Sequence, residues 1–189
     1  MEKQSFWQKY FTVKNIVLNG LIAALYAGVT IACAPLSYSF LQFRFSELLN
    51  LFVFFNPTTV VGLTLGCLIA NVASLYGLWD ILLGTLTTFV ACILMIVYSK
   101  FIKNLFTTGL IPCLLNALVV PFTIYLSCMG TDAAFILEPV IYFTMFGWVF
   151  LGEAVCILAV GYPIFMLLSK TNPSFYKIIG ATRNLDFKW

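Results

Sequence analysis

Long apolar stretches, separated by short polar or proline-containing segments, make up most of the chain. A bilayer core takes roughly 20 residues of helix, whereas a barrel strand needs about 10 alternating residues. The stretches approach the helical length and do not alternate, so we expect helices to cross the membrane. They are residues 15–34, 44–55, 58–76, 81–98, 110–128 and 140–168, of which 44–55 is short enough on its own to be re-entrant.

The basic residues indicate how many stretches cross. Lys and Arg near the ends of spans mark the cytoplasmic side, and nine of the ten basic residues lie before the first stretch, after the last or between the fourth and fifth, with Arg44 the exception. Both termini are then cytoplasmic, which requires an even number of crossings. The sequence predicts an all-α membrane protein with six transmembrane helices in a compact bundle. Its parts are a cytoplasmic juxtamembrane segment (1–14), the membrane domain (15–168) and a basic cytoplasmic tail (169–189).

Composition removes several classes of protein. Of 189 residues, 62% are hydrophobic and 9% charged, against roughly 25% charged in a soluble domain. A soluble enzyme, a nucleic-acid-binding protein and a secreted disulfide scaffold are thereby excluded. The chain has no histidine and no GxxxxGK[ST] loop, and its six cysteines lie in or beside apolar stretches without a CxxC pair. We therefore expect no metal site and interpret the cysteines as packing residues.

Polar side chains inside the apolar stretches are the candidate binding residues, because an ionisable group costs roughly 2.5 to 3.5 kcal/mol in the membrane. They come from five predicted helices, as a ligand cavity within a bundle requires. Each also has a structural interpretation. Arg44 and Glu47, three residues apart, can form an ion pair, and Asp80 can cap a helix. Glu153 can be a carboxylate that burial keeps neutral and that bonds to a neighbouring amide, and the two asparagines can bridge helices. The set is Arg44, Glu47, Asn71, Asp80, Asn116 and Glu153.

The first helix carries two rows of small residues at the spacing that lets another helix approach closely. One row is Ala23 and Ala27, and the other is Gly20, Ala24 and Gly28. Internal packing is the alternative for either row, and the spacing does not say which row faces outward.

The chain resembles the substrate-binding S-components of energy-coupling-factor (ECF) transporters, and within them the queuosine-precursor transporter (QueT) family. The resemblance covers residues 15–168. It rests on AALYA (23–27), FRFSELLNL (43–51), GLTLGCLIAN (62–71), WDILLGTLTT (79–88), IPCLLNALVV (111–120) and LGEAV (151–155) in this order.

The resemblance implies a multi-pass subunit of the cell membrane that captures a 7-deazaguanine, 7-aminomethyl-7-deazaguanine (pre-queuosine-1), from outside. Its partners would be a transmembrane coupling protein and two cytoplasmic ATPases, which bind the ATP, so this chain would hold no cofactor. The family's docking motif falls on Ala23 and Ala27.

The charges of the candidate residues fit that solute. Arg44, Glu47 and Glu153 sum to −1 and Asp80 adds a further negative charge, so the site suits a cation better than an anionic vitamin. A carboxylate can accept the two neighbouring N–H groups of a guanine-like edge. We expect Glu153 to bind this edge and Glu47, oriented by Arg44, to bind the amine.

Two other functions are compatible with parts of this pattern. An intramembrane hydrolase or transferase would use Glu47 or Glu153 as its base, but without His or a GxSxG elbow we expect no enzyme. A stand-alone ion-coupled carrier or channel for a small cationic or nucleobase-like solute would use Glu153 as a proton relay. Such a carrier needs no partner, so co-purification separates it from the importer.

Overall fold

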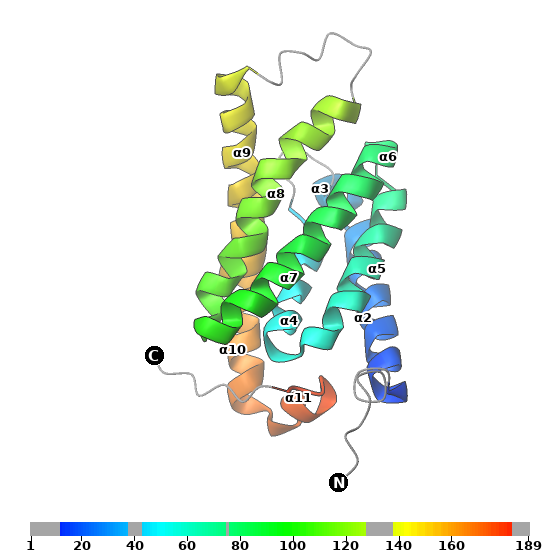
Figure 1. The fold of residues 1–189 in the computed structure, drawn as a ribbon, viewed down its shortest axis with the longest axis vertical. Coiled ribbons are helices and arrows are strands. Elements are labelled where there is room, and N and C mark those ends of the chain that lie inside the picture. Colours follow the sequence, from blue (N-terminus) through cyan, green and yellow to red (C-terminus); the bar gives the residue numbers. More distant parts are fainter. Residues whose placement is uncertain (1–11, 38–42, 75, 128–137, 183–189) are drawn as a thin grey trace.

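The computed structural model describes residues 12–37, 43–74, 76–127 and 138–182, which form an elongated bundle of helices (Figure 1). The first half contains α2 (Val13–Ala32), α3 (Ala34–Ser37), the 3-10 helix η1 (Phe45–Leu51), α4 (Phe52–Phe55), the 3-10 turn η2 (Pro57–Thr59) and α5 (Val60–Val72). The second half contains α6 (Gly77–Trp79), the π-helical η3 (Asp80–Gly84), α7 (Thr85–Phe101), α8 (Leu105–Ser127), α9 (Pro139–Ala154), the π-helical η5 (Val155–Gly161), α10 (Tyr162–Thr171) and α11 (Pro173–Ile178). The all-helical prediction is confirmed for these residues.

The helices differ in their ability to cross a bilayer. Four are long and apolar enough by themselves: Val13–Ala32, Gly77–Phe101, Leu105–Ser127 and Pro139–Thr171. The second and third predicted spans are shorter helices, Phe45–Phe55 and Pro57–Val72. The fourth span begins earlier than we expected, at Gly77, because Gly77 takes a positive φ of 62° and lets the chain turn directly into a helix.

Asn56 explains why the second helix stops. Its backbone is extended, its side-chain oxygen accepts from the amide of Thr58, and its side-chain nitrogen donates to the carbonyl oxygen of Ile179 at 2.8 Å. Pro57 then opens the next turn, at the position where its missing N–H costs nothing. One side chain thus ends the second helix and fixes the segment that follows α11.

An aromatic cluster fills the space beneath the short second helix. The ring of Phe55 contacts Phe165 of α10 and Phe175 and Tyr176 of α11, with centroids 5.5 to 6.1 Å apart. Phe175 is 7% exposed. We expected only a basic tail after residue 169, but its first part folds back as α11 because these aromatic side chains have apolar surface to bury.

Helices α2 and α5 pack closely through small residues. The side-chain oxygen of Asn19 accepts from the amide of Gly62 at 2.6 Å. A Cβ atom on Gly66 would lie 2.7 Å from the Cβ of Tyr26 and 2.9 Å from the carbonyl oxygen of Ala23. Glycine is therefore required at this contact, and the row bearing Ala23 faces the interior of the bundle.

This packing places Ala23 and Ala27, the predicted docking residues, inside the bundle. These residues are 7% and 6% exposed, so they offer little surface to a partner here, and docking at them stays a prediction. The other row is open: Ala24 is exposed, and a Cβ atom added to Gly20 or Gly28 would meet nothing within 4 Å. The spacing was the same for both rows, so only tertiary packing could decide between them.

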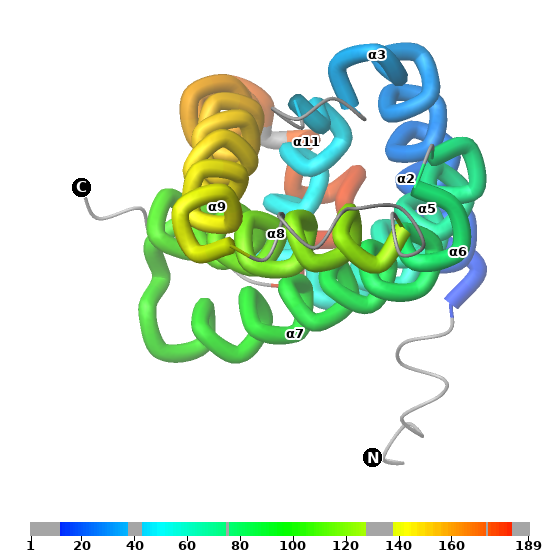
Figure 2. Tube along the Cα trace, turned by 90° about the horizontal axis from the view of Figure 1, so that it is seen from above, coloured from blue at the N-terminus to red at the C-terminus, as the bar shows by residue number. Residues whose placement is uncertain are grey.

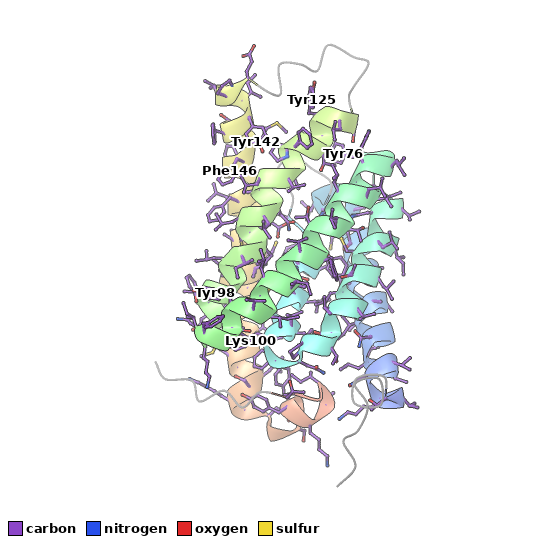
Figure 3. The ribbon with its side chains drawn as sticks, viewed as in Figure 1. Tyr76, Tyr98, Lys100, Tyr125, Tyr142 and Phe146 are labelled. Carbon is purple, nitrogen blue, oxygen red and sulfur yellow. The ribbon has the colours of Figure 1, made fainter. Side chains whose placement is uncertain are left out.

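Basic residues gather at one end of the bundle. Lys14 lies at the start of α2, Lys100 at the end of α7 and Lys177 in α11, and these element ends lie together at the bottom of Figures 1 and 3. Lys14 also donates to the carbonyl oxygen of Lys177 at 2.8 Å.

Candidate functional site

The predicted site residues converge on the middle of the bundle. Viewed from above, η1 and α4 run through the centre, with α2, α5, α7, α8 and α9 around them (Figure 2). The six side chains are buried, from 0% to 6% exposed: Arg44, Glu47, Asn71, Asp80, Asn116 and Glu153. Burial of so many polar groups in a membrane protein requires partners for each of them.

Arg44 forms a salt bridge with Asp80 rather than the expected one with Glu47. Its Nη2 lies 3.2 Å from Oδ2 of Asp80, and both side chains are about 95% buried. The expected pairing assumed one helical face, but Arg44 precedes η1 with φ −89° and ψ 89°. Its side chain is therefore free of the helical register and reaches across to η3.

The structural alternative for Asp80, a helix N-cap, is wrong. The helix begins at Gly77, and Asp80 lies one turn inside it, at the first position of the π-helical η3. π-Helical turns inside α-helices occur frequently at functional sites. The extra residue in this turn places the carboxylate inward, where Arg44 neutralises it.

Asn71 joins this group from α5 through one end of its amide. Its Nδ2 donates to the carbonyl oxygen of Asp80 at 3.0 Å and to the sulfur of Cys67 at 3.4 Å. Its Oδ1 is buried without a hydrogen-bond partner in the part of the chain that the structure describes. The helix-bridging interpretation therefore accounts for the nitrogen of this side chain and leaves the oxygen unexplained.

Glu47 is held by two residues that the sequence analysis did not single out. Tyr26 of α2 donates its hydroxyl to Oε1, and Asn50, one turn further along η1, donates its amide to Oε2. Tyr26 and Asn50 are 1% and 0% exposed. A tyrosine among small apolar residues and an asparagine three positions after a buried glutamate were the available signals.

One carboxylate oxygen of Glu153 accepts a hydrogen bond from a described residue, and the other does not. Asn116 of α8 donates to its Oε1 at 2.9 Å, whereas Oε2 is buried and accepts no hydrogen bond from any described residue. Glu47 and Arg44 both act on Glu153 electrostatically, so the two carboxylates belong to one cluster. Like Asp80, Glu153 lies next to a π-helical segment, since η5 begins two residues later.

The unsatisfied atoms define what the site can bind. Asn71 Oδ1 and Glu153 Oε2 are both acceptors, and leaving a buried acceptor unpaired costs about 1 to 3 kcal/mol. The charges of Arg44, Asp80, Glu47 and Glu153 sum formally to −2. The arrangement therefore suits a small ligand that is rich in N–H donors and positively charged. Among the described residues, no three His, Cys, Asp or Glu side chains are grouped to hold a metal ion.

Comparisons with known proteins agree on one family. The family model described as "QueT transporter" matches residues 16–170. The queuosine precursor transporter QueT of Lactococcus lactis subsp. cremoris (strain MG1363) is 30% identical over 142 residues, covering 74% of this chain and 83% of the relative. No solved structure gives a significant match.

Proposed function

Because the chain belongs to the QueT transporter family, we propose that it is the substrate-binding membrane subunit of an ECF-type importer that captures 7-aminomethyl-7-deazaguanine. Membership confirms the family resemblance seen in the sequence motifs. It also removes the enzyme alternative, since the family is one of transporters of the cell membrane. The substrate, the coupling to ATP and the partner subunits are the parts that we propose.

The vacant oxygen of Glu153 carries the substrate proposal. A guanine-like edge presents an N1–H and an exocyclic amine side by side, which matches a carboxylate that still has acceptor capacity. Among residues 12–37, 43–74, 76–127 and 138–182, nothing donates to Oε2 of Glu153, and Oε1 accepts a hydrogen bond from the amide of Asn116. Glu153 therefore remains our choice for the ring edge.

Glu47 is a weaker choice for the amine than the sequence alone indicated. Both of its oxygens already accept a hydrogen bond, from Tyr26 and Asn50. Arg44, which we expected to orient it, is engaged with Asp80. We assign to Glu47 the structural task of holding η1 against α2.

The proposed orientation places both termini in the cytoplasm. The lysines at the lower end of the bundle support it, because positive charge collects on the cytoplasmic side. The proposed docking face for the coupling protein is the outward row Gly20, Ala24 and Gly28, which lacks bulky side chains.

Native mass spectrometry of the purified chain, incubated with 7-aminomethyl-7-deazaguanine, tests the substrate. One bound molecule, retained against a tenfold excess of adenine, is expected.

Co-expression with a coupling protein and its ATPases tests the class of transporter. A stable complex supports the importer, whereas uptake by the chain alone, in the absence of ATPases, would establish the stand-alone carrier.

A further inference from the structure

Where α5 meets η3, a region we call the α5–η3 corner, the acceptor oxygen Asn71 Oδ1 lacks a hydrogen-bond partner among the described residues, as Glu153 Oε2 does. Both protons on Nδ2 of Asn71 are committed, one to the carbonyl oxygen of Asp80 and one to the sulfur of Cys67. Reversing the amide would aim its oxygen at the carbonyl oxygen of Asp80, which can only accept, so this contact fixes which atom is the oxygen. Oδ1 is thus a positioned, buried acceptor that has no hydrogen-bond partner among the described residues.

Gly84 gives this corner its shape. A Cβ atom at position 84 would lie 2.8 Å from Nδ2 of Asn71 and 2.8 Å from Oδ1 of Asp80. Even an alanine would therefore displace the Asn71 amide or the Asp80 carboxylate. By contrast, a Cβ atom on Gly147 of α9 would meet nothing within 4 Å.

The charges at the corner favour a cation. Asp80 binds Arg44 through Oδ2. A second cation beside Asp80 would place the carboxylate between two positive groups and so be attracted to it. Glu47 offers no comparable vacancy, because each of its oxygens already accepts a hydrogen bond. Four buried side-chain oxygens lack a hydrogen-bond partner among the described residues: the hydroxyls of Ser37 and Thr85, Asn71 Oδ1 and Glu153 Oε2. Asn71 Oδ1 and Glu153 Oε2 belong to the candidate site and lie on different helices, α5 and α9.

We infer that the primary ammonium group of the ligand donates to Asn71 Oδ1 beside Asp80, while the guanine-like edge meets Glu153, and that Gly84 is a positioning residue for this contact. The inference rests on the proposed substrate class. It departs from the assignment of the amine to Glu47 and makes Asn71 the residue that distinguishes an amine from a neutral substituent.

The test compares the affinities of the full-length chain for 7-aminomethyl-7-deazaguanine and for its 7-cyano analogue. We expect the native chain to bind the amine more tightly than the nitrile. In Asn71→Leu the ratio of these two affinities should fall about tenfold, because one hydrogen bond to a charged group is lost. The affinity for the nitrile should change little. Glu47→Gln should leave the preference intact.

Gly84→Ala provides a second, independent variant. This variant keeps every polar group and should lower the ratio of amine affinity to nitrile affinity, whereas the matched Gly147→Ala should leave the ratio unchanged. If Asn71→Leu fails to fold, the result for Gly84→Ala decides the test. A preference that survives both changes, or one that collapses in Glu47→Gln, overturns the inference. Equal native affinity for both compounds also overturns it but leaves the proposed function standing. Failure of the native chain to bind either compound refutes the proposed function itself.

Discussion

At the scale of single residues, most polar atoms of the candidate site have partners. Arg44 and Asp80 form a salt bridge, and Asn116 donates to one oxygen of Glu153. Asn71 Oδ1 and Glu153 Oε2 are buried without a hydrogen-bond partner among the described residues, which is uncommon in native structures. We propose that the ligand supplies their donors.

Glu153→Gln should weaken ligand binding at least about tenfold. The change keeps the volume of the side chain but removes its charge and turns one acceptor oxygen into a donor, which would face the N–H pair of the ligand. Titration of the purified variant with 7-aminomethyl-7-deazaguanine measures the effect. Unchanged affinity in a variant with a native unfolding temperature would remove Glu153 from the site.

Asp80→Leu should destabilise the fold by about 3 to 5 kcal/mol, because it removes the carboxylate that neutralises the buried Arg44 charge. The double variant Arg44→Met with Asp80→Leu removes both charges and should recover most of the loss. Thermal unfolding in detergent compares the two proteins. A double variant no more stable than the single one would mean that the pair is not the source of the effect.

At the scale of helices, the sequence predicted the elements better than their contacts. Apolar length located every predicted helix to within a few residues, apart from the earlier starts of the fourth and fifth and the earlier end of the third, at Val72 instead of residue 76. It could not predict the pairing of Arg44 with Asp80, 36 positions apart, because that contact depends on how η1 sits against η3. For the same reason the sequence selected six of the buried polar residues but not Asn50 or Tyr26, whose role follows from the contact between α2 and η1.

Gly66→Ala should destabilise the contact between α2 and α5. The added methyl group would lie 2.7 Å from the Cβ of Tyr26, and overpacking of this kind costs about 1 to 3 kcal/mol. It should also weaken the hydrogen bond from Tyr26 to Glu47. Gly28→Ala is the matched control, since its methyl group would occupy open space. Equal unfolding temperatures for the two variants would contradict the close packing.

At the scale of the whole molecule, the described residues divide into an interior that contains the buried polar side chains and an outer surface that can face lipid or a partner. The candidate site lies among η1, η3, α5, α8 and α9, whereas the open row of α2 points away from the bundle. Capture and docking would then use different faces of the chain. Mutations should be able to abolish one activity without the other.

Ala24→Trp and Ala23→Trp test this separation on neighbouring positions. Ala24 is exposed, so a tryptophan there should leave ligand affinity and unfolding temperature unchanged while blocking close approach by the coupling protein. Ala23 is 7% exposed and lies against Gly66, so the same change there should disrupt the α2–α5 contact and reduce folding, binding and uptake together. The measurements are ligand titration of the isolated chain, co-purification with the coupling protein and uptake by cells.

If Ala24→Trp retained both the complex and uptake, the partner would have to dock on another face. If Ala23→Trp lost uptake alone, the buried row rather than the open one would be the docking surface, and α2 would have to rotate when the complex forms.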